Sequence, residues 1–439
     1  MFTSKLRSRI VAVYFIALAF MMYYSQDRSI SIPYTIALRQ VFVVCIIFSG
    51  FVCFLVRPNI ARASVAIRSA FAFAAPMFVM IVVSLPIWFT QRASTSELFQ
   101  EMAILVNMNQ LLAALAAATF LYMFGEIGIW YNLVALVLAN LAVIVTIMAE
   151  HGVGAYLREL GRLITSFAGN TGDIIVQAEV HEMAFCMGVY LTYMLLHFRK
   201  DVWYLCLMIL SAFCFVSAFK RIAMAAIAVA FVVGIIFKFL KHLGKERTIR
   251  ICINLVWVGV CVLLLLYIPF VKEGGFHLLE DIGLDTMSRA EMYDAVDDYY
   301  TFSPDFVGHG TGWIFYQLTN VLELWENAIH NDYLQIYIDL GFWGYILWMF
   351  TMTYFRTSYF GRKGQIEDRI NTFSIMCYIL ILSTTDNTMY YQLMYTVSGI
   401  VIMGHTFDRQ VLQTDQRLFG VVEEQNRILE KKGAIWLQK

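Results

Sequence analysis

The sequence predicts an all-α, polytopic membrane protein with about twelve transmembrane helices. Of its 439 residues, 60% are hydrophobic and only 15% are charged, whereas soluble proteins average about 25% charged residues. The apolar residues occur in long continuous runs, and about 20 such residues suffice to span a bilayer as a helix. The runs do not show the period-two alternation of a transmembrane barrel. We therefore expect one helical bundle with connecting loops instead of several soluble domains.

The expected spans follow one another along almost the whole chain. They lie near residues 9–24, 34–56, 65–89, 101–123, 128–148, 180–198, 202–219, 221–240, 251–271, 331–355, 371–388 and 390–407. The first run follows basic residues, as in a signal peptide, but no small-residue cleavage site follows it, so we expect it to remain as a span. The predicted organisation is a bundle of nine spans, a large loop, three further spans and an amphipathic tail, at residues 1–271, 272–330, 331–407 and 408–439.

Basic residues predict the orientation, because cytoplasmic loops of membrane proteins are rich in lysine and arginine. They gather in alternate loops, near residues 5–9, 57–68, 199–200, 238–250, 356–369 and 409. Both termini are therefore expected in the cytoplasm, and the loop 272–330 on the outer face. Lys220-Arg221, and Arg158 with Arg162, are exceptions that place cations on the outer face. One explanation is packing against the loop 272–330, in which acidic residues outnumber Lys272 and Arg289.

Several patterns are too incomplete to predict a metal, a cofactor or a nucleic-acid partner. The run starting His181-Glu182 resembles a zinc-protease helix, but Phe185 stands where the second histidine is required. The glycine-rich run 308–312 lacks the strand and the spacing of a phosphate-binding loop, and we interpret it as a turn. All eight cysteines lie in apolar runs, where they act as small apolar side chains. We expect neither a metal nor a cofactor.

The candidate functional residues are cations and one histidine that the predicted topology places on the outer face. Arg221 opens the eighth span and His330 directly precedes the tenth. Both would lie at helix N-termini, where the helix dipole is positive and free N–H groups point outward. This environment favours an anion beside Lys220-Arg221 and the neutral imidazole that a general base requires. Arginine binds phosphate oxygens with two parallel hydrogen bonds, so the cations predict a phosphate or diphosphate ligand, such as a lipid diphosphate.

Aromatic residues are frequent in the outer loop, and two interpretations remain open. Tryptophan and tyrosine form belts at membrane interfaces, and aromatic faces also pack against sugar rings. The aromatic residues in question are Tyr293, Tyr299, Tyr300, Phe302, Phe306, Trp313, Phe315, Tyr316 and Trp325. Acidic side chains among them can accept hydrogen bonds from sugar hydroxyls.

The pattern over about 57 residues resembles the O-antigen polymerase and O-antigen ligase superfamily of bacterial surface polysaccharide assembly. That family is marked by an arginine, a Gly-x-Gly turn, a His-Asn-x-Tyr-Leu motif, and an acidic residue before Gly-x-x-Gly. The corresponding residues are Arg289, Gly308-His309-Gly310, His330-Asn331-Asp332-Tyr333-Leu334, and Asp339 before Gly341 and Gly344. Weaker similarities are Arg162 with Gly169-Asn170, and Ser217 to Arg221, in which Lys220 departs from the family's Ser-Arg pair.

The resemblance implies a helical glycosyltransferase of the GT-C-like kind that uses lipid-linked sugars and has a large outer loop between spans nine and ten. It implies catalytic roles for His330, Arg289 and Arg221, with Lys220, Arg162, Asn331, Asp332 and Tyr333 as substrate-binding residues. Inverting, metal-independent transfer from an undecaprenyl-diphosphate-linked oligosaccharide is then expected on the outer face of the bacterial plasma membrane. The glycine turn is expected to act as a hinge between the two ends of the loop.

Three functions remain open at this point. A polymerase would join lipid-linked repeat units, whereas a ligase would transfer the polymer to lipid A core. A transporter of polysaccharide or lipid carrier is the alternative from another class, although charges gather at the membrane boundary instead of inside the spans. Membrane lipid, a chain-length regulator and a flippase are the partners that the polymerase interpretation implies.

Overall fold

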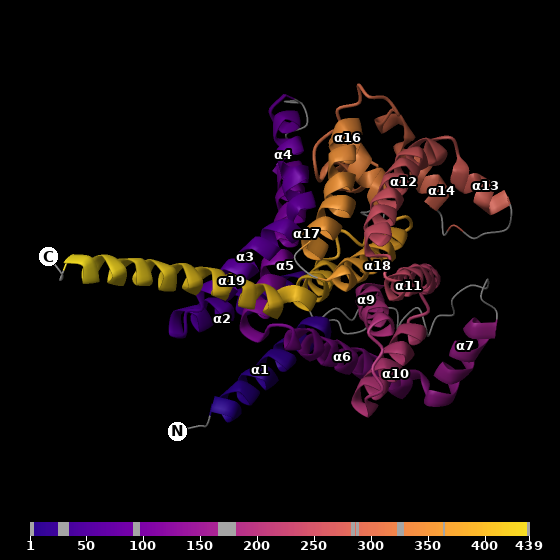
Figure 1. Cartoon of the computed structure of the whole chain (residues 1–439). Coiled ribbons are helices and arrows are strands. Elements are labelled where there is room, and N and C mark those ends of the chain that lie inside the picture. Colours follow the sequence, from indigo (N-terminus) through magenta and orange to yellow (C-terminus); the bar gives the residue numbers. More distant parts are fainter. Residues whose placement is uncertain are drawn as a thin grey trace.

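The computed structural model describes residues 4–24, 35–90, 97–165, 181–281, 286, 289–322, 329–362 and 365–436, and its described secondary structure is helical throughout. Figure 1 shows the helices in chain order. They are α1 (Ser4–Tyr24), α2 (Thr35–Val56), α3 (Ile60–Phe73), α4 (Ala75–Thr90), α5 (Glu97–Phe124), α6 (Ile127–His151), α7 (Val153–Thr165), α9 (His181–Leu196), α10 (Val202–Ser217), α11 (Arg221–His242), α12 (Glu246–Lys272), α13 (Gly275–Asp281), α14 (Arg289–Val296), the 3-10 helix η2 (Asp297–Tyr299), α15 (Trp313–Asn320), α16 (Asp332–Phe350), the π-helix η3 (Thr351–Phe355), α17 (Arg356–Arg362), α18 (Ile366–Leu382) and α19 (Gln392–Trp436).

Several helices have the length and composition of membrane spans. Within the described residues, four helices qualify: Val106–Phe124 of α5, α6, α11 and α12. The pair α3 and α4, which is bent by 55°, would add a fifth. Shorter apolar helices occur at Arg9–Tyr24, Gln40–Val56, Glu182–Leu196 and Val202–Ser217. The predicted class of helical membrane protein is confirmed, while the number of twelve spans stays a prediction.

The bend between α3 and α4 is filled by a buried arginine. Arg356 is 1% exposed and donates hydrogen bonds to the Phe73 carbonyl and, at 2.5 Å, to the Tyr395 hydroxyl. Its guanidinium also lies over the Phe73 ring, 4.3 Å from the centroid. A cation is favourable at the C-terminus of α3, where carbonyl groups are unpaired. Arg356 therefore stabilises a helix break inside the bundle, and the prediction that it lies in a loop is wrong.

The predicted tenth span is divided by a break at Gly341. This residue has φ 70° and ψ −176° inside α16, whereas residues before and after it are helical. From Asp332 to Leu340 the first half is almost completely buried in protein, and the second half continues through η3 into α17 as far as Arg362. The expected helix 331–355 is thus two segments with different surroundings.

The glycine turn packs against this break, and its function as a hinge stays a prediction. The N–H groups of His309 and Gly310 donate to the Asp339 carbonyl at 3.1 and 2.7 Å. The Asp339 carboxylate accepts hydrogen bonds from the N–H groups of Gly312 and Ile314, at 3.0 and 3.3 Å. Asp339 therefore fixes the turn and caps the start of α15.

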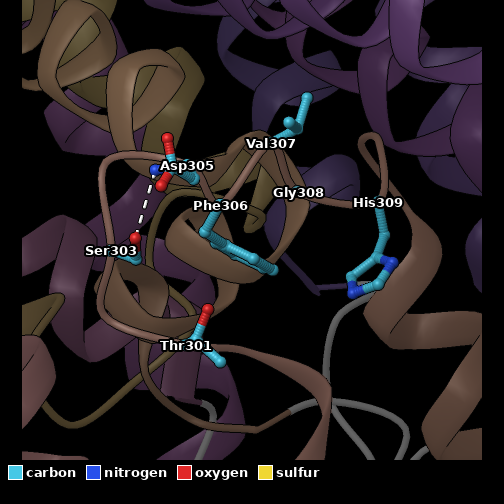
Figure 2. A pocket seen from close by; sticks show the side chains of 7 residues that line it. All are labelled: Thr301, Ser303, Asp305, Phe306, Val307, Gly308 and His309. Carbon is cyan, nitrogen blue, oxygen red and sulfur yellow. Dashed lines mark hydrogen bonds between the residues drawn. The ribbon is translucent and has the colours of Figure 1, made fainter.

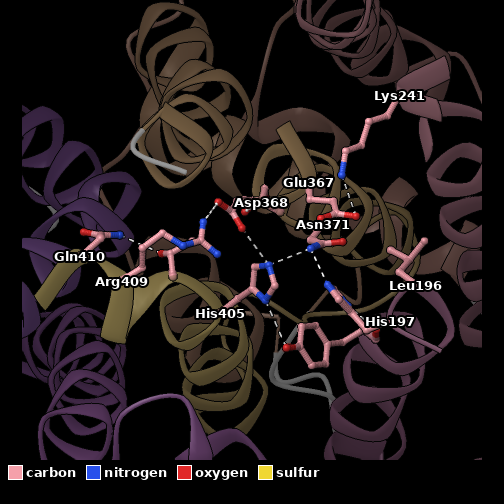
Figure 3. Close-up of polar contacts among 12 residues, drawn as sticks. Leu196, His197, Lys241, Glu367, Asp368, Asn371, His405, Arg409 and Gln410 are labelled. Atoms are coloured by element: carbon pink, nitrogen blue, oxygen red, sulfur yellow. Dashed lines mark hydrogen bonds and ion pairs between the residues drawn. The ribbon is translucent and has the colours of Figure 1, made fainter. Parts of the chain in front are cut away.

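Helices α18 and α19 are joined by polar contacts at one end of the bundle. A polar network ties α9, α11, α18 and α19 together at the end where α18 begins (Figure 3), with Asp368 accepting from His405 at 3.0 Å and from Arg409 at 2.5 Å. Beyond this network α19 continues without a break and projects from the bundle (Figure 1). The predicted tail 408–439 is therefore helical through Trp436, but it continues the last bundle helix instead of forming a separate one.

We predict that Gly341→Ala lowers the free energy of unfolding by about 2 kcal/mol or more, because it adds backbone strain and overpacking. An added Cβ would lie 2.3 Å from the Val307 carbonyl carbon, at a positive φ. The measurement is thermal unfolding of the purified protein in detergent. Gly259→Ala is the control, because a Cβ there meets no atom within 4 Å. Equal unfolding temperatures for the two variants would contradict the packing described for Gly341.

Candidate active site

His330 lies directly before α16 in a strained backbone conformation. Its φ is 51°, in the left-handed region that non-glycine residues rarely adopt. The next residue, Asn331, is the N-cap of α16: its side chain accepts from the Leu334 N–H at 3.1 Å and donates to the Tyr267 hydroxyl at 3.0 Å. Strain of this kind costs about 1–3 kcal/mol and persists where the surroundings hold it. The N-cap and Tyr267 thus fix a half-buried imidazole that is 31% exposed.

The neighbour of His330 is Asp386, a buried carboxylate in the segment between α18 and α19. Its Oδ1 lies 3.6 Å from His330 Nδ1 and accepts a hydrogen bond from the Tyr391 hydroxyl at 2.7 Å. A separation of 3.6 Å is an electrostatic contact, slightly longer than a hydrogen bond. Burial would raise the pKa of Asp386, but contact with His330, the charge of Lys220 and the Tyr391 hydroxyl together hold that pKa well below its usual range. This environment favours the ionised form of Asp386, which contacts His330 and is stabilised by the charge of Lys220.

Lys220 and Arg221 begin α11 in an arrangement similar to that of His330 and α16. Phe219 has φ 45°, Lys220 is the N-cap, and Arg221 is the first helical residue. Both cations are half-buried. Phe219, in the left-handed region, thus directly precedes the N-cap Lys220. Lys220 and Arg221 place two positive charges at the N-terminus of α11, where free N–H groups also favour an anion.

Arg289 is the first residue of α14. Tyr293 lies near both Arg289 and His330. Its guanidinium lies close enough to the buried Tyr293 to oppose the rise that burial causes in the pKa of that phenol. The Tyr293 hydroxyl in turn points to the His330 carbonyl at 3.5 Å. Arg289 Nη1 donates to the Thr286 carbonyl at 3.2 Å, whereas Nε is buried and has no hydrogen-bond partner among the residues that the structure describes. The guanidinium therefore retains a donor that a bound anion could satisfy.

Asn331, Asp332 and Tyr333 are buried, and their side chains bind protein groups, although Asp332 Oδ1 has no hydrogen-bond partner among the described residues. Asp332 Oδ2 accepts from the Thr388 hydroxyl at 3.0 Å and from the Met389 N–H at 2.9 Å. The Tyr333 hydroxyl donates to the Leu380 carbonyl at 2.6 Å. These contacts attach the start of α16 to the segment that carries Asp386. The geometry thus gives the three residues a positioning function, and the predicted contact with substrate stays a prediction.

Arg162 lies on a neighbouring helix. Its helix, α7, packs on α6 and buries Tyr156 against Ser217 and Cys214 of α10, close to the Lys220 turn. Arg162 itself is exposed, and Figure 1 shows α7 apart from α13 and α14. The structure therefore brings His330, Lys220 and Arg289 together around Asp386 and the tyrosines, with Arg221 next to Lys220 and Arg162 farther along the surface. Gly169-Asn170 lies outside the described residues.

Sequence reasoning did not select Asp386 as a site residue. It lies 56 positions from His330 in a turn between two predicted spans, and nothing in one sequence pairs such distant residues. A weak signal was present: a carboxylate at the outer end of a span is costly to bury unless a cation or histidine lies beside it.

The fold and the site together define a helical membrane protein with a histidine–carboxylate pair and several cations at one end of the bundle. Residues 206–349 match the family model described as O-Antigen ligase. The matched range contains Lys220, Arg221, Arg289 and His330, and it covers about a third of the chain. The resemblance to the O-antigen polymerase and ligase superfamily is thereby confirmed. This family indicates a glycosyl-transferring membrane enzyme with lipid-linked polysaccharide substrates, in a bacterial inner membrane. No curated protein matches the chain.

We predict that Asp386→Asn lowers the stability of the protein by about 1.5–3 kcal/mol at neutral pH, the range for hydrogen bonds to a charged group. The pKa of Asp386 is depressed in the folded protein, so its contribution is present above the unfolded-state pKa of about 3.9 and is lost as the pH falls below that value. The difference between the two proteins should therefore be constant near pH 6–8 and shrink below about pH 4.

Thermal unfolding in detergent across this pH range measures the difference. Asp298→Asn is the matched control, because Asp298 is an exposed carboxylate on the same side of the bundle as α14. A difference between wild type and Asp386→Asn that grows toward acid pH would contradict the assignment of Asp386 as a stabilised anion.

Proposed function

We propose that the protein is an inverting glycosyltransferase that joins undecaprenyl-diphosphate-linked repeat units into a polysaccharide, without a metal ion. The observation that carries this proposal is the His330–Asp386 contact at 3.6 Å with Lys220 and Arg289 gathered around it. A general base beside fixed cations matches the two requirements of transfer from a sugar diphosphate: an activated hydroxyl and a stabilised leaving group.

His330 is the proposed general base. Asp386 faces Nδ1 and favours the tautomer in which that nitrogen carries the hydrogen, so that Nε2 presents the lone pair. Nε2 takes the proton of an acceptor sugar hydroxyl while the hydroxyl oxygen forms a bond to the anomeric carbon of the donor. The bond between that carbon and the diphosphate oxygen breaks, and its electron pair leaves with the diphosphate. Attack from the face opposite the leaving group inverts the anomeric configuration. Catalytic contacts are often longer in unliganded proteins, which fits the 3.6 Å separation.

The cations are the proposed site of the leaving diphosphate. Arg221 and Lys220 stand at the N-terminus of α11, and Arg289 has a buried Nε that makes no hydrogen bond within the described chain. Guanidinium groups and helix N–H groups bind phosphate oxygens and lower the energy of the charge that develops there. Fixed positive charges would serve the purpose that a divalent metal serves in other transferases. Arg162 is assigned to the approach of the lipid carrier along the surface.

The proposed orientation places the loop 272–330 and the site on the outer face, with both termini in the cytoplasm. Basic residues in the alternate loops support this arrangement. A flippase would then supply the lipid-linked unit from the cytoplasmic face, and a chain-length regulator would set the extent of polymerisation.

A ligase that transfers finished polymer to lipid A core is the second candidate, and the description of the matching family favours it. We favour a polymerase because the segment 272–330 has acidic residues in excess of Lys272 and Arg289, which suits a growing glycan better than an anionic lipid A core. Deletion of the gene in its host separates the two. A polymerase mutant displays single capped repeats, whereas a ligase mutant accumulates full-length polymer on the carrier lipid.

We predict that His330→Ala lowers the rate of chain growth about 10²–10⁴-fold, the usual contribution of a general base. The assay uses purified protein in nanodiscs with lipid-linked repeat units. His277→Gln is the control, because His277 is an exposed histidine on α13. A chelator should leave the rate unchanged. Near-normal growth by His330→Ala, or loss of wild-type activity with the chelator, would refute the mechanism.

Charge and geometry at the leaving-group site can be separated by substitution. We predict that Arg289→Gln and Arg221→Gln each lower the rate about 10²–10³-fold, as expected for loss of an electrostatic group. The corresponding lysine variants should retain more activity, because they keep the charge but lose the paired donors. The measurement is a single-turnover rate at saturating substrate. Equal activities for the glutamine and lysine variants would contradict a leaving-group role.

A further inference from the structure

A hollow of about 340 Å³ lies on the loop between η2 and α15. His330 is not among the residues that line it. Its lining includes Thr301, Ser303, Asp305, Phe306 and His309 (Figure 2). Sites for small ligands combine a few polar groups with an apolar wall, and their volumes begin at about 300 Å³. The proposed reaction assigns no function to this hollow.

The walls of the hollow are held in place by the packing below them. Phe306 stacks on Tyr337 of α16 with ring centroids 5.4 Å apart, and the Tyr337 hydroxyl donates to the Thr301 carbonyl at 2.8 Å. The Ser303 hydroxyl accepts from the Asp305 N–H at 3.2 Å. Because the glycine turn is also anchored on Asp339, the hollow is preformed, and a ligand would lose little free energy in ordering it.

The chemistry of the lining suits a neutral sugar. Figure 2 shows the Phe306 ring between Thr301 and His309, and an aromatic face packs against the C–H face of a sugar ring. Asp305 is an exposed carboxylate whose two oxygens can accept from neighbouring hydroxyls. Burial lowers the pKa of His309, and its Nε2 donates to the Tyr299 carbonyl at 2.9 Å, so Nδ1 is an acceptor.

Asp305, the carboxylate in the lining of the hollow, disfavours an acidic ligand. Asp297, Asp298 and Asp305 lie on the same short segment, and the Lys272 ammonium is paired with Asp297 at 2.9 Å. A carboxylate or phosphate on the ligand would meet like charges, which opposes binding.

The first half of α16, which begins just after His330, also supports the hollow. Tyr337, which supports Thr301 and Phe306, lies five residues after Asp332, the first residue of α16, and so about 8 Å from it along the helix axis. This common support by one buried helical segment is the reason for assigning the hollow to the same saccharide chain.

We propose that this hollow is a saccharide subsite that binds a neutral sugar unit of the lipid-linked chain at a distance from the reacting bond. The identity of that chain rests on the proposed function, but sugar binding itself does not depend on catalysis. Phe306 supplies the stacking face, and Asp305 accepts from sugar hydroxyls and repels acidic sugars.

The test is saturation-transfer NMR on the full chain in nanodiscs, with neutral malto- and chito-oligosaccharides and oligogalacturonates of equal length as probes. We expect a neutral probe to bind and the acidic probe to bind at least about tenfold more weakly. Asp305→Asn and Phe306→Leu should each weaken neutral binding about tenfold, which corresponds to about 1.4 kcal/mol. Asp298→Asn, the control, should leave it unchanged.

His330→Ala separates this proposal from the proposed reaction, because it should keep saccharide binding while losing chain growth. Normal chain growth by that variant would refute the reaction and leave the subsite standing. Absence of binding by every neutral probe, equal binding of the acidic probe, or unchanged binding in both Asp305→Asn and Phe306→Leu would overturn the subsite.

Discussion

The contact between Asp386 and its neighbours is the interaction on which the rest of the site depends. A carboxylate that is 5% exposed is stable as an anion only if positive charge or donors surround it. His330, Lys220 and Tyr391 meet this requirement, and Lys220 precedes the other two by more than a hundred residues in the sequence. Interactions that stabilise the buried Asp386 carboxylate therefore connect the start of α11, the start of α16 and the turn between α18 and α19. Asp332 strengthens this arrangement by binding Thr388 and Met389 of the same turn.

Backbone strain and close packing give the site its geometry. Phe219 and His330 both adopt a positive φ directly before a helix N-cap, so the chain turns sharply at the start of each helix. Gly341 and Gly308 allow the loop to approach the backbone of α16 more closely than any side chain would permit. The first half of α16 is consequently a rigid, buried rod that supports His330 at its start and the 301–309 hollow farther along. Positional precision at both places then depends on the same segment.

Much of this organisation can be predicted from the sequence, because hydrophobic runs and basic loops reflect the membrane directly. The helix starts at Arg221 and after His330 were predicted correctly, and so was the superfamily. The sequence could not reveal Asp386 as the partner of His330, since that contact joins distant positions. Substrate contacts for Asn331, Asp332 and Tyr333 stay a prediction, and the structure adds that these side chains also bind protein groups. Arg356 was placed in a loop because the sequence alone does not distinguish a buried arginine from one in a loop. The break in α16 could not be predicted, because Gly341 alone indicates it in the sequence.

The central claim is that Arg221, Lys220 and Arg289 form one diphosphate site next to His330, and its most direct test is a cryo-EM structure of the protein with undecaprenyl diphosphate bound. The account predicts the diphosphate at the N-terminus of α11, with the guanidinium groups of Arg221 and Arg289 within hydrogen-bond distance of its oxygens, and His330 Nε2 facing the position of the missing sugar. A diphosphate bound elsewhere in the bundle, or one that contacts neither arginine, would contradict it.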